Sequence, residues 1–236
     1  MNEIPSSETR ARIEAYYTAV APFYEAETAI RRDIPGWIAL VRRVGPRRVL
    51  DLGCGGGRLA PALAGTEAVG VDLHTALARG QPPFAFVGGD LRALPFATGS
   101  FDLAVAANDP YAHLLGDDER RQSIAEALRV ARRVVIDGLA LPPPDRTRAR
   151  EGELERRSIL PGGVVREERW RWRGDDAYRV TYRYLRGATM LAEATTDVRA
   201  WRVDEPALAA FDVTLSGTLA GGVYDPDGAG FVIEVR

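Results

Sequence analysis

Residues 47–65 read RRVLDLGCGGGRLAPALAG, and they combine three patterns that belong together in one type of fold. The apolar pattern RRVLDL predicts a strand, four glycines follow within five positions, and helix-forming residues come next. Glycine permits positive φ and lacks the Cβ that would keep a ligand away from the backbone. The stretch therefore predicts a strand, a ligand-binding turn and a helix.

Strands and helices continue to alternate on the C-terminal side of this stretch, which indicates a parallel sheet covered on both faces. On the N-terminal side, residues 7–30 contain helix formers interrupted by Pro22 and predict one or two short helices, and residues 37–44 have helical spacing. The further expected strands are residues 68–73, 84–90, 101–108 and 132–141, and the further expected helices are residues 74–80 and 117–131.

The pattern changes after the prolines at 142–144. Apolar and polar residues alternate over residues 167–173, 177–184 and 191–201, which predicts three antiparallel strands, the first two joined by a turn at 174–176. The alternation places Trp170 and Trp172 on one face, where we expect them to be packed against the core or a partner. Residues 211–219 and 228–236 predict a hairpin that closes the main sheet.

The composition is that of an ordinary soluble globular chain, with 236 residues, 46% hydrophobic and 27% charged. No signal-peptide pattern and no apolar run of about 18 residues occurs, so we expect a cytoplasmic protein without membrane contact. Cys54 is the single cysteine, and we expect no disulfide and no metal site. A net charge of −2 argues against a dedicated nucleic-acid binder.

The spacing of the glycines in this loop must be compared with that of dinucleotide-binding loops, because those loops are also rich in glycine. A G-x-G-x-x-G starting at Gly53 fails at Arg58, but a G-x-G-x-x-A exists at Gly55, Gly57 and Ala60 and leaves a nicotinamide-dependent oxidoreductase open. Asp51 favours a different ligand. A carboxylate just before the loop would repel a pyrophosphate, whereas it attracts a cofactor that carries an ammonium and a sulfonium.

Two further carboxylates follow strand ends. Asp72 lies roughly 20 residues after the first loop glycine, where a carboxylate can accept hydrogen bonds from both ribose hydroxyls. Asp90 follows the third strand and is placed to accept a hydrogen bond from an adenine amino group, with Leu91 packing on the ring. These positions predict a nucleoside-containing cofactor along one edge of the sheet.

The segments VLDLGCGGGR, VGVDLH, GDLRALPF and SFDLAV, in this order, resemble the successive cofactor motifs of class I S-adenosylmethionine-dependent methyltransferases, over roughly residues 8 to 140. The resemblance implies S-adenosyl-L-methionine as cofactor, with Asp51 and Gly53 at its methionine end, Asp72 at the ribose and Asp90 at the adenine. Further expected cofactor contacts are Cys54, Gly55, Gly57, Leu73, Leu91, Asn108, Tyr16 and Tyr24.

The segment YYTAVAPFYEA at residues 16–26 and the antiparallel insertion are similar to the small-molecule branch of this family, which includes sugar N-methyltransferases of natural-product pathways. This similarity implies methyl transfer to an oxygen or nitrogen of a small-molecule acceptor in secondary metabolism. The chain departs from the family pattern in two places. A proline-glycine-glycine turn is missing before the fifth strand, and the helix before the last hairpin is reduced to residues 204–211.

The loop after the fourth strand, residues 108–113, carries the candidate catalytic residues. It lies at the carboxyl edge of the sheet, where open α/β sheets bind ligands. His113 is either a base for the acceptor or a residue that orients it. Tyr16, Tyr17, Phe23 and Tyr24 form either a lid over the sulfonium or ordinary packing against the sheet. The candidate catalytic residues are Asn108, Asp109, Tyr111 and His113.

We therefore predict an α/β fold with a Rossmann-like, seven-stranded, mainly parallel sheet and an antiparallel β-meander inserted after strand five. The expected divisions are lid helices at 1–45, the cofactor-binding core at 46–141, the insertion at 142–203 and the closing hairpin at 204–236. The expected partner is a small-molecule acceptor, and a homodimer is left open. Alternatives are a cyclase or binding protein that uses the cofactor structurally, the oxidoreductase, and a nucleic-acid methyltransferase.

Overall fold

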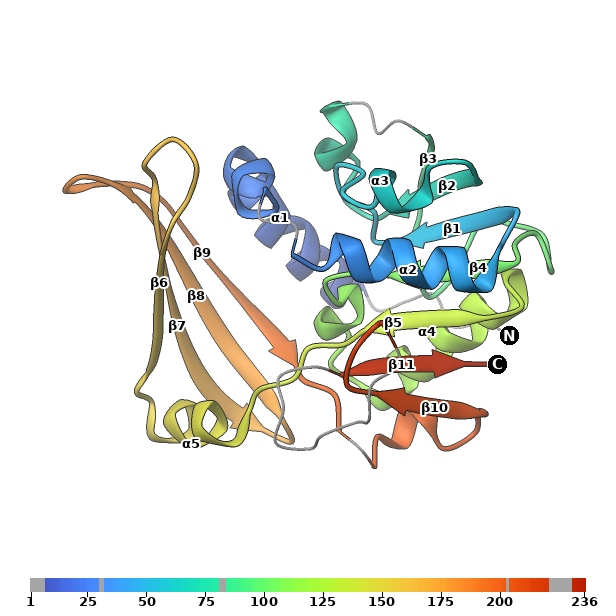
Figure 1. Cartoon of the computed structure of the whole chain (residues 1–236). Helices are drawn as coiled ribbons and strands as arrows, with labels where there is room; N and C mark the ends of the chain where they lie inside the picture. The colour runs from blue at the N-terminus through green and yellow to red at the C-terminus, as the bar shows by residue number, and fades with distance from the viewer. Residues whose placement is uncertain (1–6, 30–31, 81–83, 203, 221–230) are drawn as a thin grey trace.

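The chain folds around two sheets that lie side by side, with one long helix between them (Figure 1). The computed structural model describes residues 7–29, 32–80, 84–202, 204–220 and 231–236. Seven strands form the main sheet, and four form a separate antiparallel sheet.

The main sheet has the strand order β10-β11-β5-β4-β1-β2-β3. Its first five strands along the chain are parallel, and the C-terminal hairpin adds β11 antiparallel to β5. This arrangement confirms the predicted fold class, including the closing hairpin. The strands are β1 (Arg48–Leu52), β2 (Glu67–Asp72), β3 (Ala85–Gly88), β4 (Leu103–Ala106), β5 (Val134–Asp137), β10 (Val213–Ser216) and β11 (Val232–Val235).

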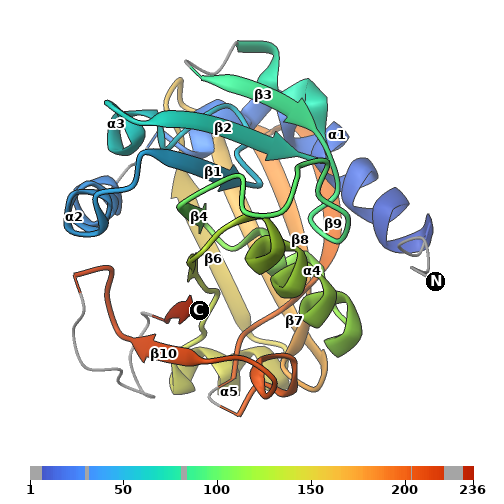
Figure 2. The same ribbon diagram turned by 90° about the vertical axis from the view of Figure 1, so that its right-hand side faces the viewer.

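Helices cover both faces of the main sheet, as Figure 2 shows. On one face α2 (Ile34–Val44) and α3 (Ala60–Leu63) bury a core around Trp37, and on the other α4 (Asp117–Val130) packs through Ile124 and Ala127. The expected helix after the glycine loop is only the single turn α3. The remaining short helices are η1 (Thr75–Gly80), η2 (Pro110–His113) and η3 (Pro206–Leu208).

The N-terminal segment forms one continuous helix, α1 (Ser7–Glu27), and not two interrupted at Pro22. A proline inside a helix removes one hydrogen bond and costs roughly 3 kcal/mol. The loss is offset by packing, because Val20 is fully buried against the antiparallel sheet and the Phe23 ring stacks on Tyr184 with their centroids 4.1 Å apart. Tertiary contacts therefore hold the helix together across the proline.

The antiparallel sheet has four strands, and the sequence analysis missed the first, β6 (Leu154–Ile159). Its outward charges hide the alternation, since Glu155 and Arg157 pair across the strands with Arg169 and Glu167. The other elements are α5 (Pro143–Glu151), β7 (Val165–Gly174), β8 (Ala177–Arg186) and β9 (Thr189–Arg199). The turn at 174–176 is confirmed.

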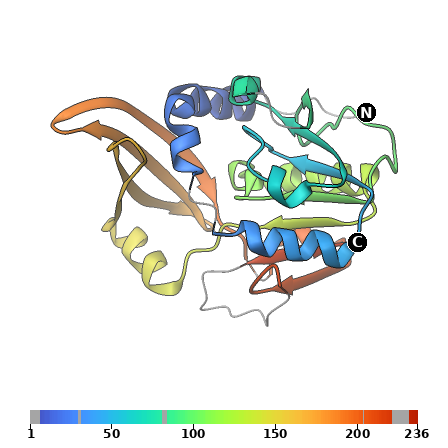
Figure 3. The ribbon, with the colours of Figure 1, turned by 45° about the horizontal axis from the view of Figure 1, so that its top comes forward.

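One face of this sheet packs toward α1 and the main domain (Figure 3). Trp170, Tyr178 and Tyr184 on that face are buried, whereas Trp172 is 45% exposed, contrary to the packing expected for it. Trp172 lies near the end of β7, beyond the reach of the core, and the Arg150 guanidinium lies over its ring. Within the described ranges no helix combines the length and apolar character that crossing a membrane requires.

Candidate functional site

The glycine-rich loop leaves β1 in a conformation that requires glycine. Gly53, Gly55 and Gly57 have φ of 68°, 52° and 82°, a region that side chains with a Cβ adopt rarely. A Cβ on Gly53 would lie 2.5 Å from the Pro110 Cβ. A Cβ on Gly55 would lie 2.8 Å from the Tyr24 hydroxyl oxygen. The loop is therefore in direct contact with η2 on one side and with α1 on the other.

Asp51 lies beneath this loop at the end of β1 and is 2% exposed. Its Oδ2 atom has no hydrogen-bond partner within the described part of the chain. Burial, with a further contribution from Asp72, raises the pKa of Asp51 to about 8, although Arg58 opposes the shift. A buried carboxyl in this state is stabilised by a cation that binds next to it. It thus fits the ammonium group of the expected cofactor.

Asp72 holds the loop in place and also lines a cavity. Its Oδ2 accepts the Gly55 N–H at 2.8 Å, and its Oδ1 accepts the His74 N–H at 2.8 Å. Burial raises the pKa of Asp72, and these two backbone hydrogen bonds oppose the shift. Each carboxylate oxygen has a second lone pair, so the predicted ribose contacts remain available to Asp72.

A cavity of about 60 Å³ lies beside the loop at the edge of β1 and β2. Asp90, at one end of it, accepts hydrogen bonds from the Arg92 guanidinium at 2.8 and 3.0 Å. Burial would raise the pKa of Asp90, but the bonds from Arg92 hold it below its usual value. The lining includes predicted cofactor contacts from four segments of the chain: Gly53, Asp72, Leu73, Asp90, Leu91 and Tyr24.

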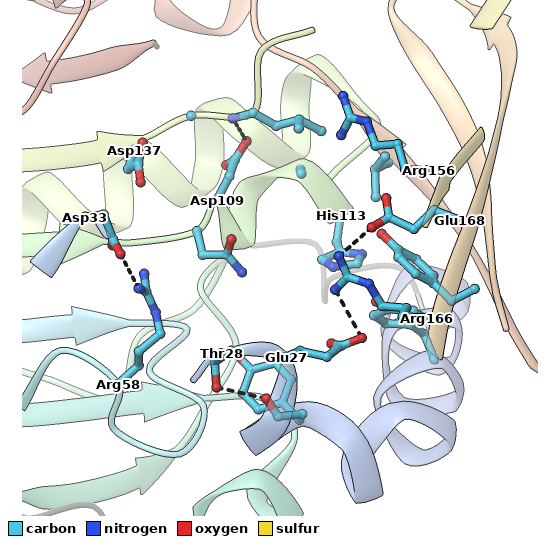
Figure 4. A pocket seen from close by; sticks show the side chains of 18 of the residues that line it. Glu27, Thr28, Asp33, Arg58, Asp109, His113, Asp137, Arg156, Arg166 and Glu168 are labelled. Atoms are coloured by element: carbon cyan, nitrogen blue, oxygen red, sulfur yellow. Dashed lines mark hydrogen bonds and ion pairs between the residues drawn. The ribbon is translucent and has the colours of Figure 1, made fainter. Parts of the chain in front are cut away.

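A second, larger cavity of about 590 Å³ lies between α1, the loop after β4 and the antiparallel sheet (Figure 4). Three side chains line both cavities: Tyr17 and Tyr24 of α1 and His113 of η2. These residues form the wall between the two spaces. Tyr16, expected at the cofactor, lines the larger cavity, as do Asn108 and Asp109.

His113 is buried between the two cavities. Its Nε2 lies 3.2 Å from the Tyr17 hydroxyl, and its Nδ1 lies 3.5 Å from the Thr196 hydroxyl. The Arg12 guanidinium donates to the His113 carbonyl at 2.5 Å. Burial, helped by the positive charge of Arg12, lowers the pKa of His113 to about 3. At neutral pH the imidazole is therefore uncharged, which makes it a weak base and a suitable orienting group.

We expect the His113 imidazole to stay neutral in the free protein across pH 5 to 9. Its ¹⁵N chemical shifts should be constant over this range in an NMR titration, and comparison with His113→Asn assigns the signals, since His74 is the only other histidine. A titration of the His113 signals with a midpoint between pH 6 and 7 would instead indicate that this residue can act as the base.

Two ion-pair groups shape the larger cavity. Arg166 of β7 pairs with Glu27 of α1 at 3.3 Å and with Glu168 at 2.5 Å, so it ties the end of α1 to the antiparallel sheet. On the opposite side Arg58 pairs with Asp33 at 2.6 Å. Sequence reasoning missed these contacts, because nothing in the sequence indicates which charges of distant segments meet.

Five predicted site residues line neither of the two cavities: Asp51, Cys54, Gly55, Gly57 and Tyr111. Tyr111 is fully buried in the core of the main domain and packs against Trp201, because the turn of η2 directs it inward, so it lines neither of the two cavities. Cys54 is buried with its Sγ close to Gly70, and burial raises the pKa of its thiol. A thiolate is strongly disfavoured there, so this thiol is unsuited to act as a nucleophile.

Asp109 and Asp137 face the larger cavity at the carboxyl ends of β4 and β5. Asp109 is 5% exposed and accepts the Leu139 N–H at 2.6 Å. Burial raises the pKa of Asp109 to about 6. Burial, together with Asp109 and Asp33, also raises the pKa of Asp137 to about 6. The sequence predicts Asp109 at this edge but not Asp137, because the predicted strand 132–141 runs past Asp137, whereas β5 ends at it.

Residues 49–133 match the family model described as a methyltransferase domain. A curated relative, malonyl-[acyl-carrier protein] O-methyltransferase from Legionella pneumophila, is 40% identical over 75 residues, which are 27% of this chain and 26% of the relative. The chain therefore spans about a quarter of that relative's length. This agreement confirms the resemblance identified from the four motifs.

Solved structures extend the likeness over almost the whole fold. The CcbJ methyltransferase from Streptomyces caelestis superposes with a TM-score of 0.77 at 20% identity, over 94% of this chain and 97% of that chain. A structure with bound S-adenosylmethionine, an amino pentose methyltransferase of calicheamicin biosynthesis from Micromonospora echinaspora, has a TM-score of 0.68 at 17% identity, over 100% of this chain and 99% of that chain. The fold is that of these S-adenosylmethionine-dependent methyltransferases.

Proposed function

We propose that this chain, which carries a class I methyltransferase domain, transfers a methyl group from S-adenosylmethionine to an oxygen or nitrogen of a small-molecule acceptor. The observation that carries the proposal is the pair of adjoining cavities. One lies along the glycine loop and the strand-end acids, the other lies over β4 and β5, and both are lined by Tyr17, Tyr24 and His113.

The cofactor residues fit the expected molecule. Asp51, whose Oδ2 has no hydrogen-bond partner among the described residues, suits its ammonium. In the smaller cavity Asp72 suits the ribose hydroxyls, and Asp90 with Leu91 suits the adenine. When bound, the sulfonium supplies an electrophilic methyl group with a good leaving group attached. The chain must then mainly place the nucleophile in line with that methyl.

The residues between the cavities supply this placement. Tyr17 and His113 are held together by their 3.2 Å contact, and Arg12 fixes the backbone of His113 from α1. The aromatic rings of Tyr17 and Tyr24 in this wall stabilise positive charge next to them. A small-molecule acceptor is supported by the volume of the larger cavity, about 590 Å³. A place in secondary metabolism is supported by the likeness to the amino pentose methyltransferase of calicheamicin biosynthesis.

The test is a product analysis. The protein with S-adenosylmethionine is incubated with a mixture of amine- and hydroxyl-bearing metabolites and followed by mass spectrometry. We expect an acceptor to gain the mass of one methylene group as S-adenosylhomocysteine accumulates, and His113→Ala to form less product because it loses the contact to Tyr17. A product of unchanged mass would instead indicate a cyclase that uses the cofactor structurally.

A further inference from the structure

The charged side chains that line the larger cavity are not evenly paired, and the excess of negative charge lies at the end of the cavity next to β5. Of its acids, Asp33 is neutralised by Arg58, while Glu27 and Glu168 share Arg166. Asp109 and Asp137 form no ion pair within the part of the chain that the structure describes. Two carboxyl groups without a contacting ion-pair partner thus line a cavity large enough for a small metabolite, although the buried Arg120, which does not line the cavity, opposes the rise that burial causes in the pKa of Asp109.

Two further arginines line this cavity, Arg156 and Arg32. Arg156 pairs with Asp145 at 2.6 Å and lies over the Trp170 ring, and Arg32 is exposed. Arg58 lowers the pKa of Asp137 only as the weaker, opposing influence. The β5 end is therefore electronegative, and a cation that enters the cavity is attracted to this end.

An independent observation indicates that a ligand group belongs there. Asp109 lines the cavity and is 5% exposed, and its Oδ2 is held by Leu139. Its Oδ1 forms no complete hydrogen bond among the described residues, although Arg120 and the buried Trp201 side chain oppose the rise that burial causes in the pKa of this carboxyl. A buried carboxylate oxygen without a donor is costly unless a ligand supplies one. Asp137 stands beside it at the end of the neighbouring strand, as Figure 4 shows.

We propose, resting on the proposed function, that the β5 end of the larger cavity binds the attacking amine of the acceptor and that Asp137 accepts the proton this amine loses. The ammonium N–H donates to the Asp137 carboxylate and gives up its proton. The nitrogen lone pair then forms the new N–C bond, and the pair of the breaking C–S bond stays on sulfur. The protonated carboxyl returns its proton to water when the product leaves.

Asp137 suits this role better than His113. Its carboxylate lies at the sheet edge next to Asn108, on the acceptor side of the wall, while both His113 nitrogens already face hydroxyl groups of the chain. A base with a pKa of about 6 is also better matched to neutral pH than one with a pKa of about 3. His113 then orients and Asp137 receives the proton.

The experiment uses two ligands of the same shape, cyclohexylamine, which is protonated at neutral pH, and cyclohexanol. The full chain is labelled with ¹³C at its aspartate carboxyl groups, loaded with S-adenosylhomocysteine, and followed by NMR at pH 7. Comparison with Asp137→Asn assigns the Asp137 signal. We expect the amine, and not the alcohol, to shift that signal, and Asp137→Asn to weaken amine binding at least about tenfold, as for a hydrogen bond to a charged group.

Asp118→Asn is the matched control, because Asp118 is an exposed acid of α4 with a partner of its own, Arg121. It should leave amine binding unchanged. Equal shifts with both ligands, no shift with the amine, or equal amine affinity of Asp137→Asn and wild type would overturn the assignment. Failure of S-adenosylhomocysteine to load would instead refute the proposed function, so the two failures are distinguishable.

Discussion

Gly53→Ala should lower the affinity for S-adenosylhomocysteine by at least about a hundredfold. The new Cβ would lie 2.5 Å from the Pro110 Cβ on a backbone with φ of 68°, so the loop or η2 must move. A displacement that costs about 3 kcal/mol in the bound state corresponds to this loss. Because η2 also carries His113, the acceptor wall should move as well. Isothermal titration calorimetry measures the affinity.

Gly45→Ala is the matched control for backbone strain. Gly45 ends α2 with φ of 61°, and a Cβ there would meet nothing within 4 Å. It should destabilise the protein by about 1 kcal/mol and leave the affinity unchanged. If Gly53→Ala, still folded by circular dichroism, bound as tightly as Gly45→Ala, the loop would not approach the cofactor as described.

Asp51→Asn should weaken binding of S-adenosylhomocysteine by about 10- to 100-fold at pH 8. The carboxylate that would pair with the ligand's ammonium is lost, and a hydrogen bond to a charged group contributes roughly 1.5–3 kcal/mol. Asp102→Asn is the control, because Asp102 lies at the opposite edge of the sheet and holds the N–H groups of Arg47 and Arg48. An affinity loss of the same size in both variants would remove Asp51 from the site.

The same substitution should change the pH dependence of stability in the free protein. The folded state raises the pKa of Asp51 to about 8, so below that pH it holds a proton that the unfolded chain has released. Stability therefore falls as pH rises toward 8, by about 2 kcal/mol between pH 6 and 8. Asparagine does not titrate, and Asp51→Asn should lack this decline in urea unfolding measured at both pH values.

The regular alternation of strand and helix patterns along the chain made the main fold predictable from the sequence. The strands around the glycine loop are buried on both faces and read as short apolar runs, and the closing hairpin follows a period of two. Two elements were not predictable in this way. Helix α1 passes through Pro22 because distant strands pack against it, and β6 is stabilised by charges that pair with β7.

The candidate site likewise has one part that was predictable from the sequence and one part that was not. Its cofactor side follows strand ends, whose place at one sheet edge is dictated by parallel topology, and Asp72 and Asp90 line the cavity as expected. Its acceptor side depends on the antiparallel sheet, whose orientation no local pattern specifies. Arg166 meets Glu27 and Glu168 only in the folded chain, and Tyr111 turns into the core because η2 is a tight helix.

The most direct test of the central claim compares two ligands by calorimetry on the same preparation. S-adenosylhomocysteine should bind with a dissociation constant in the micromolar range, because Asp51 attracts its ammonium and Asp72 its ribose. NADH should show no measurable binding, because its pyrophosphate would lie next to the Asp51 carboxylate. Tight binding of NADH without binding of S-adenosylhomocysteine would contradict the account.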